Sequence, residues 1–479
     1  MKKLIFVWIF CLLAVSCDER LEELNVEKVN PAEVPAETLF ANGVKEAAYM
    51  MVNSSVNVNV FRLYAQYWAQ TTYPDESQYN QITREIPKNF WDRGYRRGLQ
   101  DLSIAKELMI ANPDPTLSAA GNANKLAIVD IAIAYIYSIM AETYGNIPFS
   151  QALDVDNIAP VYDDARAVYD AQIDALTTAA NTIDESAASI SGSQDIVFEG
   201  DAAGWKKFAN SLKLRMAMML ADVDAAKAQT MITEALASGL ILSPDEDAFV
   251  TYYSEAPSTN PVYEDLVLSG RRDYVPSNTL VDIMNNLNDP RRVAYFTDPI
   301  DGEYVGGIYG TANAYGDASH IGDVFHTPTL PGVLMSCSEV MFLLAEAAER
   351  GFTVPETAET YYNQGIEFSM YEWGLTQVDY LAYIAQPSVA YATAAGDWKQ
   401  KIGIQAWIAL NNRGYEGWTT WRRLDFDGLN PAEGLTLEDI PTRLLYPLEE
   451  AQLNGANLDA AISAIGGDTK TTKLWWDVN

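Results

Sequence analysis

Histidine and cysteine are the scarcest reactive residues in this chain. Of 479 residues, two are histidine and three are cysteine. Acid–base catalysis by an imidazole group therefore has two candidates, His320 and His326. Cys11 lies inside an N-terminal apolar run and Cys17 directly follows that run, so Cys337 is the one cysteine left for the folded protein. No disulfide within the mature chain is expected.

Short catalytic motifs are also missing. The sequence contains no Gly-x-Ser-x-Gly elbow, no phosphate-binding loop and no His-Glu-x-x-His helix. The pattern His320-x-x-Asp323-x-x-His326 has metal-ligating residue types, but its Gly and Pro neighbours predict no helix to fix their geometry. Acidic stretches at 243–247 and 425–428 do not match an EF-hand loop. We expect no catalytic residue, no metal centre and no cofactor, with a structural calcium ion left open.

Positive charge is scarce as well. The chain has 32 Lys and Arg against 65 Asp and Glu, a formal net charge of −33. Such a surface repels phosphate backbones, so we expect no nucleic-acid partner. High negative charge also keeps a protein soluble, and it does not by itself indicate the ligand.

The first residues predict an export signal and a lipid anchor. A positively charged start precedes an apolar run over 4–15, which is shorter than the roughly 20 residues that a membrane-spanning helix needs. The stretch over 13–17 (LAVSC) resembles a lipobox, so we expect a signal peptide over 1–16 and acyl chains on Cys17. The acidic residues at 18–19 resemble the surface-export signal of Bacteroidetes-type lipoproteins. A plain secretory signal with an incidental cysteine is the alternative.

Helical periodicity dominates the rest of the chain. The segment over 124–144 is apolar on nearly all sides, which predicts a buried central helix. Helical hairpins are expected over 201–239, where Asp201 is the N-cap, and over 336–373. The second hairpin begins with Ser336 and Glu339 at the spacing of a capping box. Further helices are expected over 93–111 and 163–183.

Residues 250–335 have a different composition, rich in Gly, Pro, Tyr and Asn and with little periodicity. A long irregular insertion in a compact protein is usually functional or disordered, and its aromatic content argues against disorder. We therefore predict a mainly all-α fold, in which a tetratricopeptide-like helical-hairpin scaffold carries a large, irregular, aromatic-rich loop region. The mature chain, 17–479, is expected to form a single domain.

Several motifs, taken with the lipobox, resemble the SusD/RagB family of nutrient-binding outer-membrane lipoproteins, particularly its SusD-like branch. They are 142–149 (ETYGNIPF), 339–351 (EVMFLLAEAAERG), 421–423 (WRR), 440–447 (IPTRLLYP) and 473–477 (KLWWD). The last three also have a structural interpretation. Arg422, Arg423 and Arg443 are expected to pair with acids, and Trp475 and Trp476 to dock the tail onto the helices.

The resemblance implies a helical scaffold, a ligand site on loops and a SusC-like TonB-dependent transporter as partner. It also implies a lipid-anchored protein on the surface of the outer membrane, which binds glycans, oligosaccharides or peptides without catalysis and delivers them to the transporter. Two alternatives stay open. One is a surface-anchored glycan-degrading enzyme, and the other is a tetratricopeptide-type adaptor for proteins.

Aromatic and polar residues gather in two stretches that suit sugar binding, because a sugar ring stacks its apolar face on an aromatic ring while polar neighbours bind its hydroxyls. The residues expected to bind ligand are Tyr73, Asp75, Tyr79, Asn80 and Trp91 in the first stretch, and Arg271, Tyr274, Tyr304, Tyr309 and Tyr315 in the second. The resemblance places the first stretch where the family has a ligand-contacting loop. For each aromatic residue alone, packing in the core is the alternative.

Overall fold

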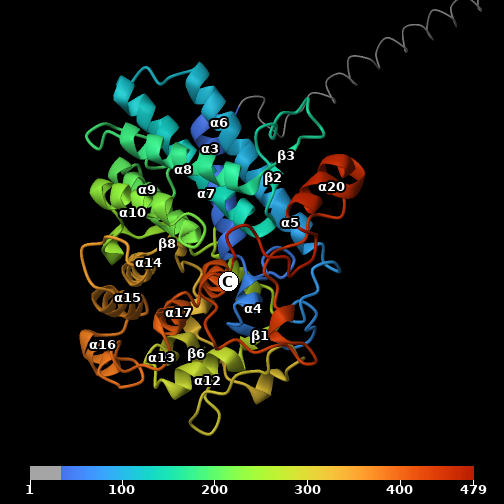
Figure 1. Cartoon of the computed structure of the whole chain (residues 1–479), viewed down its shortest axis with the longest axis vertical. Helices are drawn as coiled ribbons and strands as arrows, with labels where there is room; N and C mark the ends of the chain where they lie inside the picture. The colour runs from blue at the N-terminus through green and yellow to red at the C-terminus, as the bar shows by residue number, and fades with distance from the viewer. Residues whose placement is uncertain (1–33, 479) are drawn as a thin grey trace, which may run out of the picture.

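The computed structural model describes residues 34–478, and within this range the chain is mainly helical (Figure 1). The signal peptide expected over 1–16 and the lipidation expected at Cys17 lie outside the described residues. Within 34–478, β-structure is limited to short strands that pair two by two, apart from isolated bridges. The expectation of a mainly all-α fold built from helical hairpins is therefore confirmed.

The helices form two groups around one hydrophobic core, which extends from Phe40 to Trp476. The first group, in the upper half of Figure 1, is α3 (Ala36–Val52), α6 (Gln100–Ala111), α7 (Ala119–Tyr144), α8 (Ala165–Thr182), α9 (Ala202–Leu220) and α10 (Ala225–Ser238). The second is α14 (Cys337–Glu349), α15 (Ala358–Glu372), α16 (Gln377–Ile384), α17 (Trp398–Ala409) and α18 (Gly414–Leu424). Contacts between α9 and α14 join the groups.

Shorter elements connect these helices. They are α4 (Phe61–Tyr64), α5 (Ile86–Asp92), the π-helical η1 (Arg93–Leu99), β2 (Ile147–Pro148), β3 (Tyr162–Asp163), η2 (Pro244–Glu246), η6 (Leu437–Asp439), α19 (Glu450–Leu453) and α20 (Gly455–Ala464). The helix expected over 93–111 thus begins as a π-helix and continues as α6, which packs against α7.

Helix α7 is the buried central helix that the sequence predicts. Its N-cap is Ser118, whose hydroxyl accepts a 3.0 Å hydrogen bond from the Gly121 N–H. The helix ends at Gly145, which has a φ of 89°. A Cβ atom at position 145 would lie 3.0 Å from Leu474, so backbone conformation and tail packing both favour glycine. By length and composition α7 is able to span a membrane, but 83% of its most apolar window is buried in the protein.

The two predicted hairpins form as α9–α10 and α14–α15. Asp201 caps α9 by accepting a hydrogen bond from a first-turn N–H at 2.9 Å, as expected. Ser336 caps α14 through the Glu339 N–H at 3.3 Å, but Glu339 does not complete the capping box. Its carboxylate accepts hydrogen bonds from Arg215 and Arg413 instead, because guanidinium groups bind a carboxylate more strongly than one backbone N–H does.

A layer of buried charges joins α9, α14 and α18. Arg215 donates to Glu339 at 2.6 and 2.8 Å, and Arg423 pairs with Glu346. Oε1 of Glu416 lies 4.0 Å from Arg215 and has no hydrogen-bond partner among the described residues. A cavity of about 30 Å³ between these side chains has room for a bound water molecule.

The C-terminal block packs onto the helices. Arg443 pairs with Asp468 at 2.6 Å, as expected. Arg422 differs, because it donates at 2.9 Å to two backbone carbonyls, one of them that of Glu142. This carbonyl belongs to the last turn of α7, where no intrahelical donor is available. Trp475 packs against α8, with its ring centroid 5.2 Å from that of a tyrosine there, so the tail docks as predicted.

Residues 250–335 are less irregular than their composition suggests. They contain α11 (Pro261–Tyr263), the π-helical η3 (Glu264–Leu268), β5 (Tyr274–Pro276), α12 (Asn278–Asn286), α13 (Arg292–Tyr295), β6 (Phe296–Thr297), η4 (Tyr315–Asp317), β7 (His320–Ile321) and η5 (Asp323–His326). Strand β4 (Ala248–Val250) pairs with β8 (Gly332–Met335) at the base of this region, and β6 pairs with β7. Such short strands show no alternating pattern in the sequence.

Two buried carboxylates, one of them in the charge layer, predict that the free energy of unfolding falls as the pH rises toward neutrality. Burial raises the pKa of Glu416 from 4.5 to about 7, and that of Asp247 from 3.8 to about 7. Between these values the folded protein keeps protons that the unfolded chain has lost, so the free energy of unfolding decreases with rising pH. The free energy of unfolding can be measured by chemical denaturation near pH 5 and near pH 7.5. Its decrease between these pH values should be smaller in Glu416→Gln than in the wild type, by on the order of 2 kcal/mol.

The exposed Glu433→Gln is the matched control, because it removes one carboxylate without touching the buried layer. It should retain the wild-type pH dependence. A Glu416→Gln protein with the same pH dependence as Glu433→Gln would contradict the role given to Glu416.

Candidate functional site

Strand pairing brings together the two stretches that the sequence predicts to bind ligand. β1 (Trp68–Gln70) pairs with β5, so that Gln70 lies opposite Tyr274. The N–H of Thr71 extends the ladder by donating to the Asp273 carbonyl at 2.9 Å. A cavity of about 220 Å³, the β1–β5 pocket, opens beside this ladder. It is lined by Ser55, Val56, Asn57, Gln70, Thr72, Tyr73, Arg84, Asp265, Arg271, Asp273 and Tyr274.

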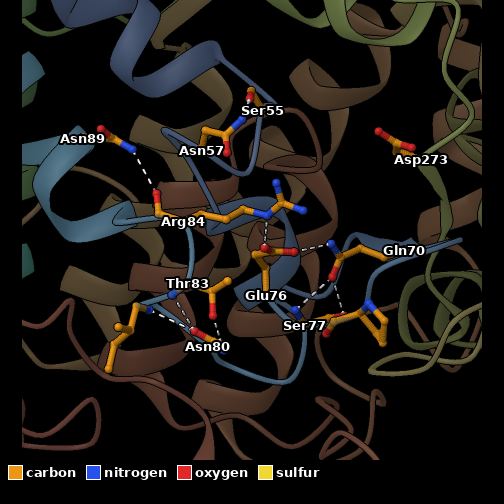
Figure 2. A network of polar contacts seen from close by, with 12 residues as sticks. Ser55, Asn57, Gln70, Glu76, Ser77, Asn80, Thr83, Arg84, Asn89 and Asp273 are labelled. Atoms are coloured by element: carbon orange, nitrogen blue, oxygen red, sulfur yellow. Dashed lines mark hydrogen bonds and ion pairs between the residues drawn. The ribbon is translucent and has the colours of Figure 1, made fainter.

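A buried carboxylate organises residues 71–85, which we name the pocket loop. Glu76 is 1% exposed, and its oxygens accept hydrogen bonds from Nε of Arg84 and, at 2.6 Å, from the amide of Gln70. The amide oxygen of Gln70 accepts in turn from the N–H and the hydroxyl of Ser77, at 3.0 and 2.8 Å. Figure 2 shows this chain of contacts, which leaves neither end of the Gln70 amide unpaired.

Arg84 presents its outer edge to the pocket. Its Nε is bound to Glu76, whereas no residue within 34–478 accepts a hydrogen bond from its two terminal amino groups. In Figure 2 these groups point away from Glu76, toward the space that Asn57 and Asp273 border. The Arg84 side chain is 33% exposed, so the remaining N–H donors are available to a ligand.

Side-chain amides hold the pocket loop in a strained conformation. Tyr79 and Glu85 have left-handed φ angles of 67° and 51°, which cost a non-glycine residue about 1 kcal/mol or more each. Two glutamines bind the loop to distant backbone, Gln78 to Gly310 and Gln81 to Arg443 and Leu445. A third, Gln66, lies two positions before β1 and binds the backbone of Asn430. The loop is therefore shaped before any ligand arrives.

Two further carboxylates face the pocket. Asp273, 32% exposed, accepts hydrogen bonds from Arg271 at 2.5 and 3.2 Å. Asp265, on η3, accepts one from the hydroxyl of Ser54 at 2.9 Å. Burial raises the pKa of Asp265, and the positive charge of the buried Arg62 acts in the opposite direction. π-helical turns such as η3 occur frequently at functional sites.

Three of the ten predicted ligand residues line the pocket, namely Tyr73, Arg271 and Tyr274. The Tyr73 ring is 55% exposed and is available for stacking. Tyr274 is 7% exposed, and its hydroxyl donates to a backbone carbonyl at 3.1 Å, which fixes the pocket wall. The structure thus offers one aromatic face, that of Tyr73, and a charged rim at Arg271.

The other seven lie outside this lining, and ligand contact by them stays a prediction. They are Asp75, Tyr79, Asn80, Trp91, Tyr304, Tyr309 and Tyr315. Tyr79, Trp91 and Tyr309 are 3%, 8% and 2% exposed, so in this conformation their rings pack in the core. Asp75 is exposed in the pocket loop. The side-chain oxygen of Asn80 accepts hydrogen bonds from the N–H groups of Ile82 and Thr83 in the same loop.

Tyr315 and Tyr304 are engaged by neighbouring side chains of the insertion. The Tyr315 ring stacks on His320 at 3.9 Å between centroids, and the Arg272 guanidinium lies 5.0 Å from it. The half-buried Tyr304 ring lies 5.5 Å from a phenylalanine ring of β6. These contacts stabilise the insertion that carries Arg271 and Asp273.

Sequence reasoning missed the polar side chains that complete the pocket. Glu76 and Arg84 stand eight positions apart, and opposite charges at that spacing indicate a pair only if the loop folds back on itself. Asn57 follows α3 and Asp265 follows α11, so only the tertiary structure brings them together.

Other cavities are larger but contain none of the predicted residues. α6, α7 and α8 border a groove of about 710 Å³, and α12, α15 and α17 border one of about 660 Å³. Within 34–478, no group of three or more His, Cys, Asp or Glu side chains is placed to hold a metal ion. The β1–β5 pocket is the better candidate, because polar groups with free hydrogen-bonding capacity converge on it.

Comparison with known proteins gives a consistent family. A SusD-like family model described as "Starch-binding associating with outer membrane" matches residues 28–447. A solved structure of a chitin-binding protein superposes with a TM-score of 0.77 at 25% identity, over 92% of this chain and 100% of that one. A SusD homologue from Bacteroides uniformis has a TM-score of 0.76 at 26% identity, over 92% and 99%. No curated protein sequence matches this chain.

A further structure bears on the fold alone. It is a chitin-binding SusD homologue from Flavobacterium johnsoniae, with a TM-score of 0.74 at 24% identity. The superposition covers 91% of this chain and 98% of that one. The likeness over nearly the full length of both chains places the helical scaffold and the loop insertion in one known architecture.

Gln81 is predicted to be the most sensitive tether of the pocket loop. Its side chain, 2% exposed, donates to the Arg443 carbonyl at 3.0 Å and accepts from the Leu445 N–H at 2.8 Å. Gln81→Ala leaves both backbone groups without a partner, so chemical denaturation should show a loss of about 2–3 kcal/mol. Gln78→Ala, which removes one bond from an exposed side chain, should cost about 0.5 kcal/mol. Equal losses in the two variants would contradict this assignment.

Proposed function

Since the chain belongs to the SusD-like family of starch-binding, outer-membrane-associated proteins, we propose that it captures a glycan in the β1–β5 pocket. In this proposal Cys17 anchors the mature chain to the outer face of the outer membrane. The captured oligosaccharide then passes to a SusC-like TonB-dependent transporter. The protein binds its cargo without cleaving it.

The orientation of Arg84 carries this proposal. Its terminal amino groups face the pocket and have no hydrogen-bond partner among residues 34–478, and Glu76 holds the guanidinium in place. Sugar hydroxyls occur in adjacent pairs, which a planar fork of N–H donors matches well. Because Arg84 is already oriented in the free protein, little side-chain entropy is lost when a sugar binds.

Tyr73 and the pocket's size support the same ligand class. The exposed Tyr73 ring offers an apolar face for the C–H side of a sugar ring. The volume of about 220 Å³ lies below the roughly 300–1,000 Å³ typical of pockets for drug-sized ligands. The pocket therefore suits one sugar unit of a longer chain, with the remaining units outside it.

The two alternatives, a glycan-degrading enzyme and an adaptor for proteins, are less well supported. A glycosidase needs two carboxyl groups on either side of the bond, one of them acting as an acid. The carboxylates of Glu76 and Asp273 each accept hydrogen bonds from an arginine, and Asp265 accepts one from Ser54 and interacts with the charge of Arg62, which favours recognition over proton transfer. A small polar pocket also suits a sugar better than a protein surface, and a peptide stays the alternative cargo.

Two pocket variants test the proposed capture of glycans. Calorimetry with residues 18–479 and malto-, cello- and chito-oligosaccharides should show saturable binding without cleavage products. Tyr73→Ala removes the stacking face and Arg84→Lys removes the donor fork, so each should weaken binding about tenfold. Tyr253→Ala is the matched control, because this tyrosine is 65% exposed and does not line the pocket.

The control variant should bind like the wild type. Full affinity in both Tyr73→Ala and Arg84→Lys would place the ligand elsewhere on the protein. Release of shorter oligosaccharides by the wild type would refute the non-catalytic part of the proposal.

A further inference from the structure

The charges around the β1–β5 pocket are matched one to one. Three arginines and three carboxylates border it or lie directly behind it, namely Arg62, Arg84, Arg271, Glu76, Asp265 and Asp273. Two of the pairs are joined by hydrogen bonds, Arg84 with Glu76 and Arg271 with Asp273. The pocket therefore has almost no net charge, although the protein as a whole is strongly acidic.

The third pair is held by electrostatic attraction. Asp265 and Arg62 each stabilise the charged form of the other, against the effect of burial. Burial lowers the pKa of Arg62 to about 10, so this arginine stays charged at neutral pH. Its two terminal amino groups donate to the carbonyl of Asn53 and to Asn412, at 2.9 to 3.0 Å, whereas its Nε has no hydrogen-bond partner within 34–478. Arg62 therefore balances Asp265 without reaching into the pocket.

An acidic sugar would find the charge of each arginine in this lining already matched by a carboxylate, although the terminal amino groups of Arg84 keep free donors. Its carboxylate or sulfate would approach Asp265 and Asp273, and like charges brought together in a partly buried site repel each other strongly. Arg272, which has no acidic partner within 34–478, lies against Tyr315 and is not part of the lining. Hydroxyl groups, in contrast, donate to the two carboxylates and accept from Arg84.

We infer, building on the proposed glycan binding, that the β1–β5 pocket selects neutral sugar units over acidic ones, and that Asp273 sets this selectivity. Asp273 binds Arg271 through both Nε and Nη2. The Arg271 side chain is 58% exposed at the pocket rim, so an anion from solution reaches its guanidinium easily once Asp273 no longer binds it. A free guanidinium binds a carboxylate in a bidentate manner, and Asp273 occupies that position.

Glu76 cannot have the same role in the Arg84 pair. It is 1% exposed and holds the pocket loop together through Gln70, so replacing it would disturb the loop. Asp273 is partly exposed. It contacts the pocket loop through its backbone carbonyl, which accepts a hydrogen bond from the Thr71 N–H, and a side-chain change leaves this bond intact. Asp273 is therefore the position at which selectivity can change while the fold is kept.

A matched pair of ligands tests the inference. Malto-, cello- and chito-oligosaccharides are each titrated in neutral form and after oxidation of their C6 hydroxyls to carboxylates, so that charge changes while the backbone is kept. The wild type should bind the neutral form at least about tenfold more tightly. In Asp273→Asn the released Arg271 should bring the oxidised form to within about threefold of the neutral one. The neutral form should bind this variant about threefold more weakly, because its hydroxyls lose a charged acceptor.

Two further variants test whether a change in selectivity is due to Asp273 and to the arginine that it binds. Asp317→Asn removes the same charge from an exposed position outside the pocket and should keep the wild-type preference. In the double variant Asp273→Asn with Arg271→Gln, the gained binding of oxidised ligands should be lost again. Thermal melting of each variant confirms that the fold is intact.

Each outcome has a distinct meaning. A wild type that prefers oxidised oligosaccharides would overturn the neutral selectivity while leaving glycan capture standing. An Asp273→Asn protein that gains no affinity for oxidised ligands would overturn the role of Asp273. Binding of neither form of any oligosaccharide would contradict the proposed function on which the inference rests.

Discussion

Burial of the Glu76 carboxylate is the constraint on which the pocket depends. A carboxylate that is 1% exposed has lost its hydration, so it needs charged and polar partners at fixed positions. Arg84 and Gln70 supply these contacts, and Gln70 belongs to β1, whose pairing with β5 brings in the 250–335 insertion. The same buried charge thus orders the pocket loop, orients an arginine toward the ligand and couples segments far apart in the chain.

Buried charges that need fixed partners also determine how the helices of the scaffold pack. Buried ion pairs add little net stability, because desolvation offsets attraction, but leaving one partner unpaired is costly. The pairs of Arg215 with Glu339 and of Arg423 with Glu346 therefore fix how α9, α14 and α18 meet. Glutamine amides bind the pocket loop to the insertion and to the C-terminal block, and hold its left-handed residues in place. A pocket shaped in this way needs little rearrangement to receive a sugar.

The sequence predicted the scaffold better than the pocket, for physical reasons. Periodicity and N-caps such as Asp201 are local, so the helices and hairpins could be placed from spacing alone. Tyr73 and Arg271, predicted from composition, line the pocket, whereas Trp91 and Tyr309 pack in the core, because aromatic rings are favoured in cores and in binding sites alike. Arg84 and Asp265 escaped prediction, since their convergence depends on a loop reversal and on strand pairing across distant segments.

A crystal structure of residues 18–479 with bound oligosaccharide tests the central claim most directly. The account predicts one sugar ring in the β1–β5 pocket, with adjacent hydroxyls within hydrogen-bond distance of the terminal nitrogens of Arg84 and the ring face against Tyr73. The pocket loop and the Gln70–Glu76–Arg84 contacts should keep the conformation shown in Figure 2. Sugar bound in one of the larger grooves, or a pocket loop rebuilt around the ligand, would contradict the account.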